Sequence, residues 1–202
     1  MEKKNAPGNK KAANTVITVH DKFVVGIWET SSRRISGRVV VDSLFSVESF
    51  STTKKPEHLV AKTLAKKVIP GLREIIESYE TKLTETLKTI RDEVNERMAD
   101  PLLKSIEFGA PQEQTYELVV DGRHSWPLVN RFVRSIVLVD EISQALRQMY
   151  LSGFIDYGEY KKREKKAAKP IWQCMTRLDE VIKHYHQQRK QIAAITTAAK
   201  VG

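Results

Sequence analysis

A long, one-sided run of apolar residues between Val129 and Leu151 constrains the fold of this chain more than any other feature. Its large apolar side chains recur at steps of three and four, which is the spacing of one face of an α-helix: Val129, Phe132, Val133, Ile136, Val139, Ile142, Leu146 and Met149. Val137, Leu138 and Ala145 widen this face beyond what one partner helix would cover. The sequence therefore predicts a helix about 35 Å long that is packed on two or more sides.

Local signals mark both ends of this helix. Ser125, followed by Trp126 and Pro127, is an N-cap candidate with a proline in the first turn. Gly153 supplies a residue that can adopt the left-handed conformation at a helix end. Asp156 can then cap a second helix, so we expect an antiparallel helical hairpin.

The net charge of the chain indicates what kind of partner it binds. The chain has 202 residues, with 34 Lys and Arg against 25 Asp and Glu, and its formal net charge is +9. Such an excess favours a polyanionic partner over a small-molecule substrate. No apolar run reaches the length of a transmembrane helix, and the N-terminus lacks the apolar stretch of a secretory signal, so we expect a cytoplasmic protein without a membrane partner.

The sequence contains no motif for catalysis or for cofactor binding. A glycine-rich phosphate loop, a nucleophile elbow and a paired zinc-ligand pattern are all missing. His184 and His186 are two residues apart and would point to different faces of a helix. Cys174 lies in an apolar helical setting and is interpreted as a buried structural thiol. We therefore expect no enzyme, no cofactor and no metal.

The first fifty residues combine basic segments with a short strand. Residues 1–13 contain Lys10 and Lys11 and are predicted to form a flexible basic arm. Residues 14–20 alternate β-branched and polar side chains as a strand does, with Thr18 and His20 facing one way. Asp21 can cap a short helix over Phe23, Val24, Ile27 and Trp28. A basic turn with Arg33, Arg34 and Arg38 follows, and then a second short helix over Val41, Leu44, Phe45 and Phe50, although Val39 to Val41 could equally extend a strand.

This order of strand, helix, basic turn and helix is what a ribbon-helix-helix DNA-binding module requires. In that fold two chains pair their strands into a ribbon that enters the major groove. The prediction is a mainly α protein, with a ribbon-helix-helix-like module at 14–55 and a helical extension at 56–202 for packing and oligomerisation. A strand with two short helices also fits other folds. A second candidate strand lies at 115–120, but its Glu117 would face DNA unfavourably, so the first strand is preferred.

Two features of the helical extension bear on its surfaces. After a first helical stripe, Pro70 and Gly71 are expected to end or kink the helix. Apolar residues then repeat every eleven positions, as in Leu72, Leu83 and Val94, and the outer face is acidic. This period keeps a nearly straight helix on one partner, so the segment is either a packing helix or an oligomer interface.

A dense basic run follows the predicted hairpin turn, between Tyr160 and Lys169. Its candidate phosphate contacts are Lys161, Lys162, Arg163, Lys165 and Lys166. A solvated helix face explains such a run as well as phosphate contact does, and the two interpretations stay open.

The segments ITVHDKFVVGIWE, SGRVVVDSLFSVESF and RFVRSIVLVDEISQALRQMYLSGFIDYGEYKK, with the final amphipathic helix, resemble the AcaB-type proteins of conjugative plasmids and integrating conjugative elements. The resemblance implies a bacterial transcriptional activator that binds DNA upstream of the operon for the master activator of plasmid transfer, through a ribbon-helix-helix-like dimer. It implies base contacts from Thr18 and His20. It also implies phosphate contacts from Lys10, Lys11, Arg33, Arg34 and Arg38.

Two hypotheses for function follow. The first is a sequence-specific DNA-binding regulator, a dimer or higher homo-oligomer on double-stranded DNA, with RNA polymerase as a further candidate partner. The second is an accessory protein of the DNA-transfer apparatus that contacts nucleic acid without sequence preference. A footprint separates them, because only the regulator should protect a discrete site.

Overall fold

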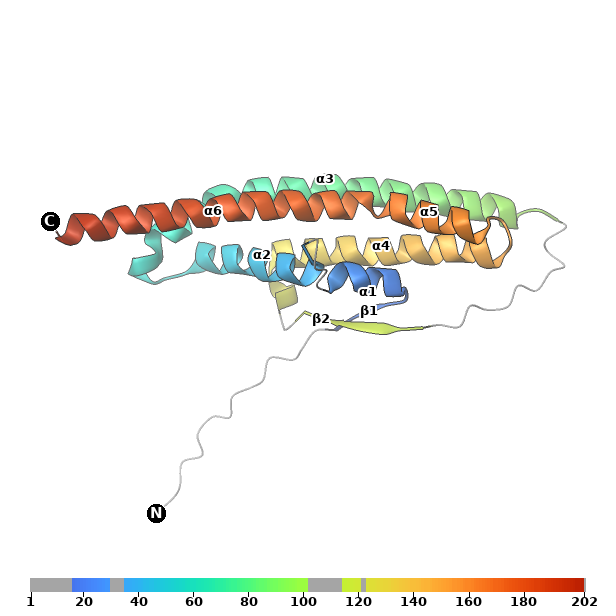
Figure 1. Cartoon of the computed structure of the whole chain (residues 1–202), viewed down its shortest axis with the longest axis horizontal. Coiled ribbons are helices and arrows are strands. Elements are labelled where there is room, and N and C mark those ends of the chain that lie inside the picture. The colour runs from blue at the N-terminus through green and yellow to red at the C-terminus, as the bar shows by residue number, and fades with distance from the viewer. Residues whose placement is uncertain (1–15, 30–34, 102–113, 121–122, 202) are drawn as a thin grey trace, which may run out of the picture.

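The computed structural model describes residues 16–29, 35–101, 114–120 and 123–201, which form an elongated helical body with a small sheet along one side (Figure 1). The described elements in chain order are β1 (Val16–Val19), α1 (Lys22–Trp28), α2 (Gly37–Thr52), η1 (Pro56–His58), α3 (Leu59–Met98), β2 (Tyr116–Val119), η3 (Arg123–Ser125), α4 (Pro127–Leu151), α5 (Tyr157–Ala167) and α6 (Lys169–Val201). The chain is therefore mainly helical with a short β ribbon, as predicted. Within the described ranges, no helix is long and apolar enough to cross a membrane.

Helix α4 lies at the centre of the packing, as the sequence predicts. It contacts α2, α3, α5 and α6 as well as α1. Phe132, Ile136 and Leu146 are completely buried on its apolar face. The same helix also buries polar residues that the apolar stripe does not include, namely Ser135, Asp140 and Ser143. The buried face is therefore wider than the apolar pattern, because neighbouring elements cover α4 on several sides.

The C-terminal end of α4 forms as predicted. Gly153 has a φ of 72°, its N–H donates to the Tyr150 carbonyl at 3.0 Å, and the Phe154 N–H donates to the Met149 carbonyl at 2.9 Å. These two bonds make a Schellman motif, which requires the left-handed residue at this position. Asp156 caps α5 by accepting a hydrogen bond from the Glu159 N–H at 2.8 Å. The expected antiparallel hairpin of α4 and α5 is thus confirmed.

The N-terminal end of α4 differs from the prediction. The N-cap residue is Trp126, and no side-chain cap from Ser125 is present. Instead, Glu48 of α2 reaches across, and its Oε1 accepts a hydrogen bond from the Leu128 N–H at 3.1 Å. A residue eighty positions away thus supplies the acceptor that a local cap usually provides, and this fastens α2 to the start of α4.

Glu48 should make folding stability depend on pH. Burial raises the pKa of its carboxyl group above the usual value, although hydrogen bonds from Leu128 and Val129 oppose the shift. Between the unfolded and the folded pKa the native state holds a proton that the unfolded chain has lost, so stability falls as pH rises through that window. We therefore expect the stability advantage of the wild type over Glu48→Gln to shrink as pH rises from about 4 to 7. Urea unfolding of both proteins at each pH measures this difference in stability. A difference that stays constant or grows with pH would contradict the prediction.

Helix α3 continues through Pro70, where the sequence predicted an end or a kink. The helix is unbroken over 40 residues, and Pro70 lies on its exposed side. Proline removes one backbone hydrogen bond inside a helix. Ala65 and Leu72 on either side of Pro70 are both completely buried. Tertiary packing of both halves therefore keeps the helix from ending at Pro70.

The eleven-residue pattern of α3 faces its own chain. Leu72, Leu83 and Val94 are buried, and α3 packs against α4 and α6. Of the two predicted roles, the segment thus takes that of a packing helix. On α6, Cys174 is buried as expected, and burial raises the pKa of its thiol to about 12.

The two candidate strands pair with each other. β1 and β2 form a two-stranded antiparallel sheet in which Val16 lies opposite Val119 and Thr18 opposite Glu117. The prediction treated the strands as alternatives and placed a second copy of the chain beside β1. In the described chain β1 instead pairs with β2 of the same chain, about one hundred residues away. The core also runs without a break from β1 to α6, across the predicted boundary at residue 55.

Candidate nucleic-acid interface

The ribbon has one inward face and one solvent face. Val19 and Leu118 are buried against the helices, whereas Val16 and Val119 are 42% and 41% exposed. Thr18 and Glu117 are exposed on the same outer side as these valines. Thr18 is thus accessible, as a base contact must be. The outer face of the described strands carries one carboxylate and no basic side chain, so any attraction to phosphates has to come from flanking elements.

The end of β1 is fastened to α4 by Asp140. Its Oδ1 accepts hydrogen bonds from the His20 N–H at 2.8 Å and from the Asp21 N–H at 3.0 Å. Its Oδ2 lies 2.8 Å from the His20 Nδ1 and accepts from the Gln144 Nε2 at 2.9 Å. The Asp140 side chain is only 3% exposed, whereas the His20 side chain is 36% exposed, so the four contacts are partly buried. His20, a predicted base contact, therefore uses its ring nitrogen within the chain.

A second polar contact joins the start of α1 to α5. The Tyr160 hydroxyl lies between Asp21 Oδ2, at 3.2 Å, and Glu164 Oε1, at 2.9 Å. Burial first, and then these two carboxylates, raise the pKa of the Tyr160 hydroxyl, which therefore stays protonated. Asp21 also caps α1, since its Oδ1 accepts from the Phe23 N–H at 2.8 Å. The end of the ribbon, α1 and α5 are thus held as one unit.

Helix α5 carries the basic run, but not all of its cations are available to a ligand. Lys161 Nζ donates to the buried Glu164 at 2.9 Å. Arg163 donates to Glu93 at 2.8 Å and to Glu159 at 2.9 Å. These predicted phosphate contacts are therefore committed to carboxylates of the chain itself.

The remaining basic residues form a continuous exposed row, which we call the lysine stripe: Lys162, Lys165, Lys166 and Lys169. Lys162, Lys165 and Lys166 are spaced at i, i+3 and i+4 and share one side of α5, and Lys169 follows as the first residue of α6. Lys162 lies 3.7 Å from Glu159, and the other three have no carboxylate at ion-pair distance in the described part of the chain. Because Tyr160 of the same helix contacts Asp21, the stripe lies on the helix that adjoins the end of the ribbon.

The other predicted phosphate contacts are divided by the described ranges. Lys10, Lys11, Arg33 and Arg34 lie outside the described residues, and so does the predicted arm at 1–13. Arg38 is described and is exposed in the first turn of α2. The structure thus presents Arg38, Thr18 and the lysine stripe to solvent.

The acidic face of α3 is partly neutralised by basic side chains of α4 and α5. Glu77 pairs with Arg131 and Glu80 with Arg134, while Glu93 pairs with Arg163. These contacts hold the three helices together. The face still presents Glu74 and Glu85 to solvent, so it is unsuited to a phosphate backbone.

Sequence reasoning missed the role of Asp140. One signal was present, because Asp140 falls on the buried side of α4, one residue after Val139. A carboxylate on a buried face needs partners. In the described ranges no group of three or more His, Cys, Asp or Glu side chains is placed to hold a metal ion.

No family model and no curated protein match the sequence of this chain. Among solved structures, selenomethionine-containing AcaB from uropathogenic E. coli is similar to it, with a TM-score of 0.61 and 16% sequence identity. The match covers 88% of this chain and 82% of that chain. The likeness concerns the fold alone, and on that basis the chain has an AcaB-like fold.

Proposed function

We propose that this protein is a DNA-binding regulator whose lysine stripe contacts the phosphate backbone. The observation that carries the proposal is the stripe itself, in which Lys165, Lys166 and Lys169 have no carboxylate partner among the described residues. Lysines that are not neutralised by their own chain release counterions when they meet phosphates, and this release drives association with DNA. The net charge of +9 acts in the same direction.

The ribbon would supply sequence recognition next to this backbone contact. Thr18 on its outer face is the candidate base contact, and Arg38 is a further candidate for phosphate. The His20 ring is bound to Asp140, so its proposed role is to position the ribbon. Lys10, Lys11, Arg33 and Arg34 remain proposed phosphate contacts outside the described residues.

A dimer is part of the proposal. β1 pairs with β2 along one edge, and its other edge has no strand partner in the described chain. An open strand edge can take a strand from a second copy. Pairing of two β1 strands would place two copies of Thr18 on one surface. Activation of conjugative transfer genes is part of the proposal on the ground of the sequence resemblance, and RNA polymerase is a proposed partner because an activator acts at a promoter.

Removal of two lysines should weaken DNA binding in a salt-dependent way. We expect the double variant Lys162→Ala with Lys166→Ala to make the slope of log affinity against log salt shallower by about 2, since each phosphate contact contributes about 0.9. The slope is measured by fluorescence anisotropy with labelled duplexes, at salt concentrations from about 50 to about 200 mM.

The matched control removes the same charge from α3. Lys66→Ala with Lys88→Ala takes two exposed lysines from that helix and should leave the slope unchanged. Equal effects of the two double variants would exclude the stripe as the contact. Absence of duplex binding by the wild type would overturn the proposed function. Footprinting on duplexes selected from a random pool then distinguishes a regulator, which protects a discrete site, from an accessory protein, which coats DNA uniformly.

A further inference from the structure

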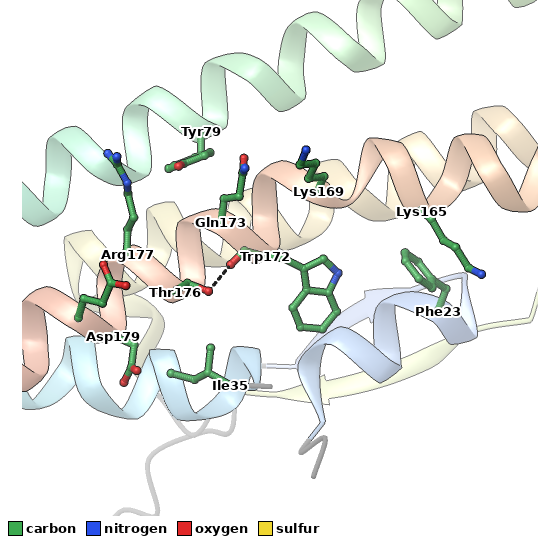
Figure 2. Close-up of a pocket in the computed structure, with 11 residues that line it drawn as sticks. Phe23, Ile35, Tyr79, Lys165, Lys169, Trp172, Gln173, Thr176, Arg177 and Asp179 are labelled. Carbon is green, nitrogen blue, oxygen red and sulfur yellow. Dashed lines mark hydrogen bonds between the residues drawn. The ribbon is translucent and has the colours of Figure 1, made fainter. Parts of the chain in front are cut away.

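An open groove runs along the outward side of α6, bordered by α1, the residues just before α2, and α3 (Figure 2). Its volume is about 1080 Å³. Pockets for small molecules usually measure about 300 to 1,000 Å³ and enclose their ligand. A groove that is at least this large and open along a helix fits a peptide segment better than a small molecule.

The middle of the groove is apolar. Phe23 from α1, Ile35 from the segment before α2 and Trp172 from α6 line it, and all three are only partly buried (Figure 2). Large apolar side chains that pack on the core with one side and face a groove with the other form the usual setting for an anchor residue of a partner.

The border of the groove is predominantly positive. Lys165, Lys169 and Arg177 line it, and none of them has an ion pair in the described part of the chain. Asp179 and Glu180 stand at the other end, where Asp179 is already paired with Lys183 at 2.7 Å. An occupant with carboxylates toward the α5 end would therefore gain favourable electrostatics.

We propose that this groove binds an acidic segment of a partner protein, with a large apolar side chain seated on Phe23, Ile35 and Trp172. The carboxylates of the segment would lie against Lys165, Lys169 and Arg177. Charge complementarity selects an acidic occupant, and the apolar floor favours a peptide over the backbone of DNA, which offers phosphates and sugars. The groove gives the protein a protein-binding surface that shares Lys165 and Lys169 with the proposed phosphate contact.

Three synthetic peptides of equal length test the proposal on the full chain. The first alternates Asp and Glu with Phe and Leu, the second replaces its acidic residues with Lys, and the third replaces its apolar residues with Ser. Only the first should bind appreciably, and the other two should bind at least about tenfold more weakly. The indole N–H signals of ¹⁵N-labelled protein locate the site, because the Trp172 signal should shift while those of Trp28 and Trp126 stay in place.

Variants separate this site from the DNA contact. Trp172→Ala should weaken binding of the acidic peptide by about tenfold or more and leave DNA binding unchanged, whereas Lys169→Glu should weaken both. Lys66→Glu on α3 should have no effect on peptide binding. The double variant Lys162→Ala with Lys166→Ala should keep peptide binding, since neither lysine lines the groove. Equal binding of the three peptides, an unmoved Trp172 signal, or full binding by a folded Trp172→Ala protein would overturn the groove proposal. Each of these results would leave the DNA-binding proposal standing.

Discussion

Asp140→Ala is expected to lower the free energy of unfolding by about 2 to 6 kcal/mol, because two partly buried backbone N–H groups lose their acceptor at about 1 to 3 kcal/mol each. These groups belong to His20 and Asp21, which Asp140 joins to α4. The loss should be concentrated at the ribbon, so amide hydrogen exchange in β1 and β2 should speed up more than exchange in α3. Denaturant unfolding and residue-resolved exchange measure the two effects.

The neighbouring residue provides the control. Glu141 pairs with Arg91 at 2.8 Å, and their side chains are 37% and 57% exposed. Glu141→Ala should lower the free energy of unfolding by less than about 1 kcal/mol, which is the range measured for surface ion pairs. If Asp140→Ala were as mild as Glu141→Ala, or if exchange rose equally everywhere, Asp140 would not be the anchor of the ribbon. A loosened ribbon should also bind selected duplexes less tightly, while the lysine stripe keeps its salt-dependent contribution.

Phe132→Ala should destabilise the whole molecule by about 3 to 5 kcal/mol, through the lost burial of the ring and the cavity that it leaves. Phe132 is completely buried in the second turn of α4, the helix that contacts most other helices. The free energy of unfolding of a typical domain is about 5 to 15 kcal/mol, so the loss is a large part of the total. Guanidinium unfolding should show a lower midpoint with an unchanged slope.

Arg134→Ala on the same helix is the matched control for Phe132→Ala. The Arg134 side chain is 70% exposed and lies 3.5 Å from Glu80. Its removal should change stability by less than about 1 kcal/mol. A cost below about 1.5 kcal/mol for Phe132→Ala would mean that α4 is not the centre of the core.

Local chemistry was enough to predict the helices and several of their ends. The stripe on α4 follows from apolar spacing, Gly153 ends that helix because it adopts a left-handed conformation, and Asp21 and Asp156 cap the helices that follow them. Each of these signals depends on residues within a few positions of one another. Such signals depend on local sequence and not on contacts between distant parts of the chain, so they can be identified from the sequence.

Pairings between distant residues were not predictable in this way. The sequence offered two candidate strands with no indication that they would pair with each other, and Glu48 was not expected to replace a local cap on α4. Both contacts depend on which surfaces the long helices bring together. At Pro70 the helix does not end, because burial on both sides outweighs one lost hydrogen bond.

By itself the sequence determined a mainly helical chain with a short ribbon and an excess of positive charge, because composition and periodicity act residue by residue. Only the tertiary structure decided which basic side chains stay available to a ligand. It pairs Lys161 and Arg163 with carboxylates and leaves the lysine stripe facing solvent, and it turns His20 inward onto Asp140. The reason is that a charge becomes neutralised or stays exposed according to what packs beside it, and those neighbours come from helices far apart in the chain.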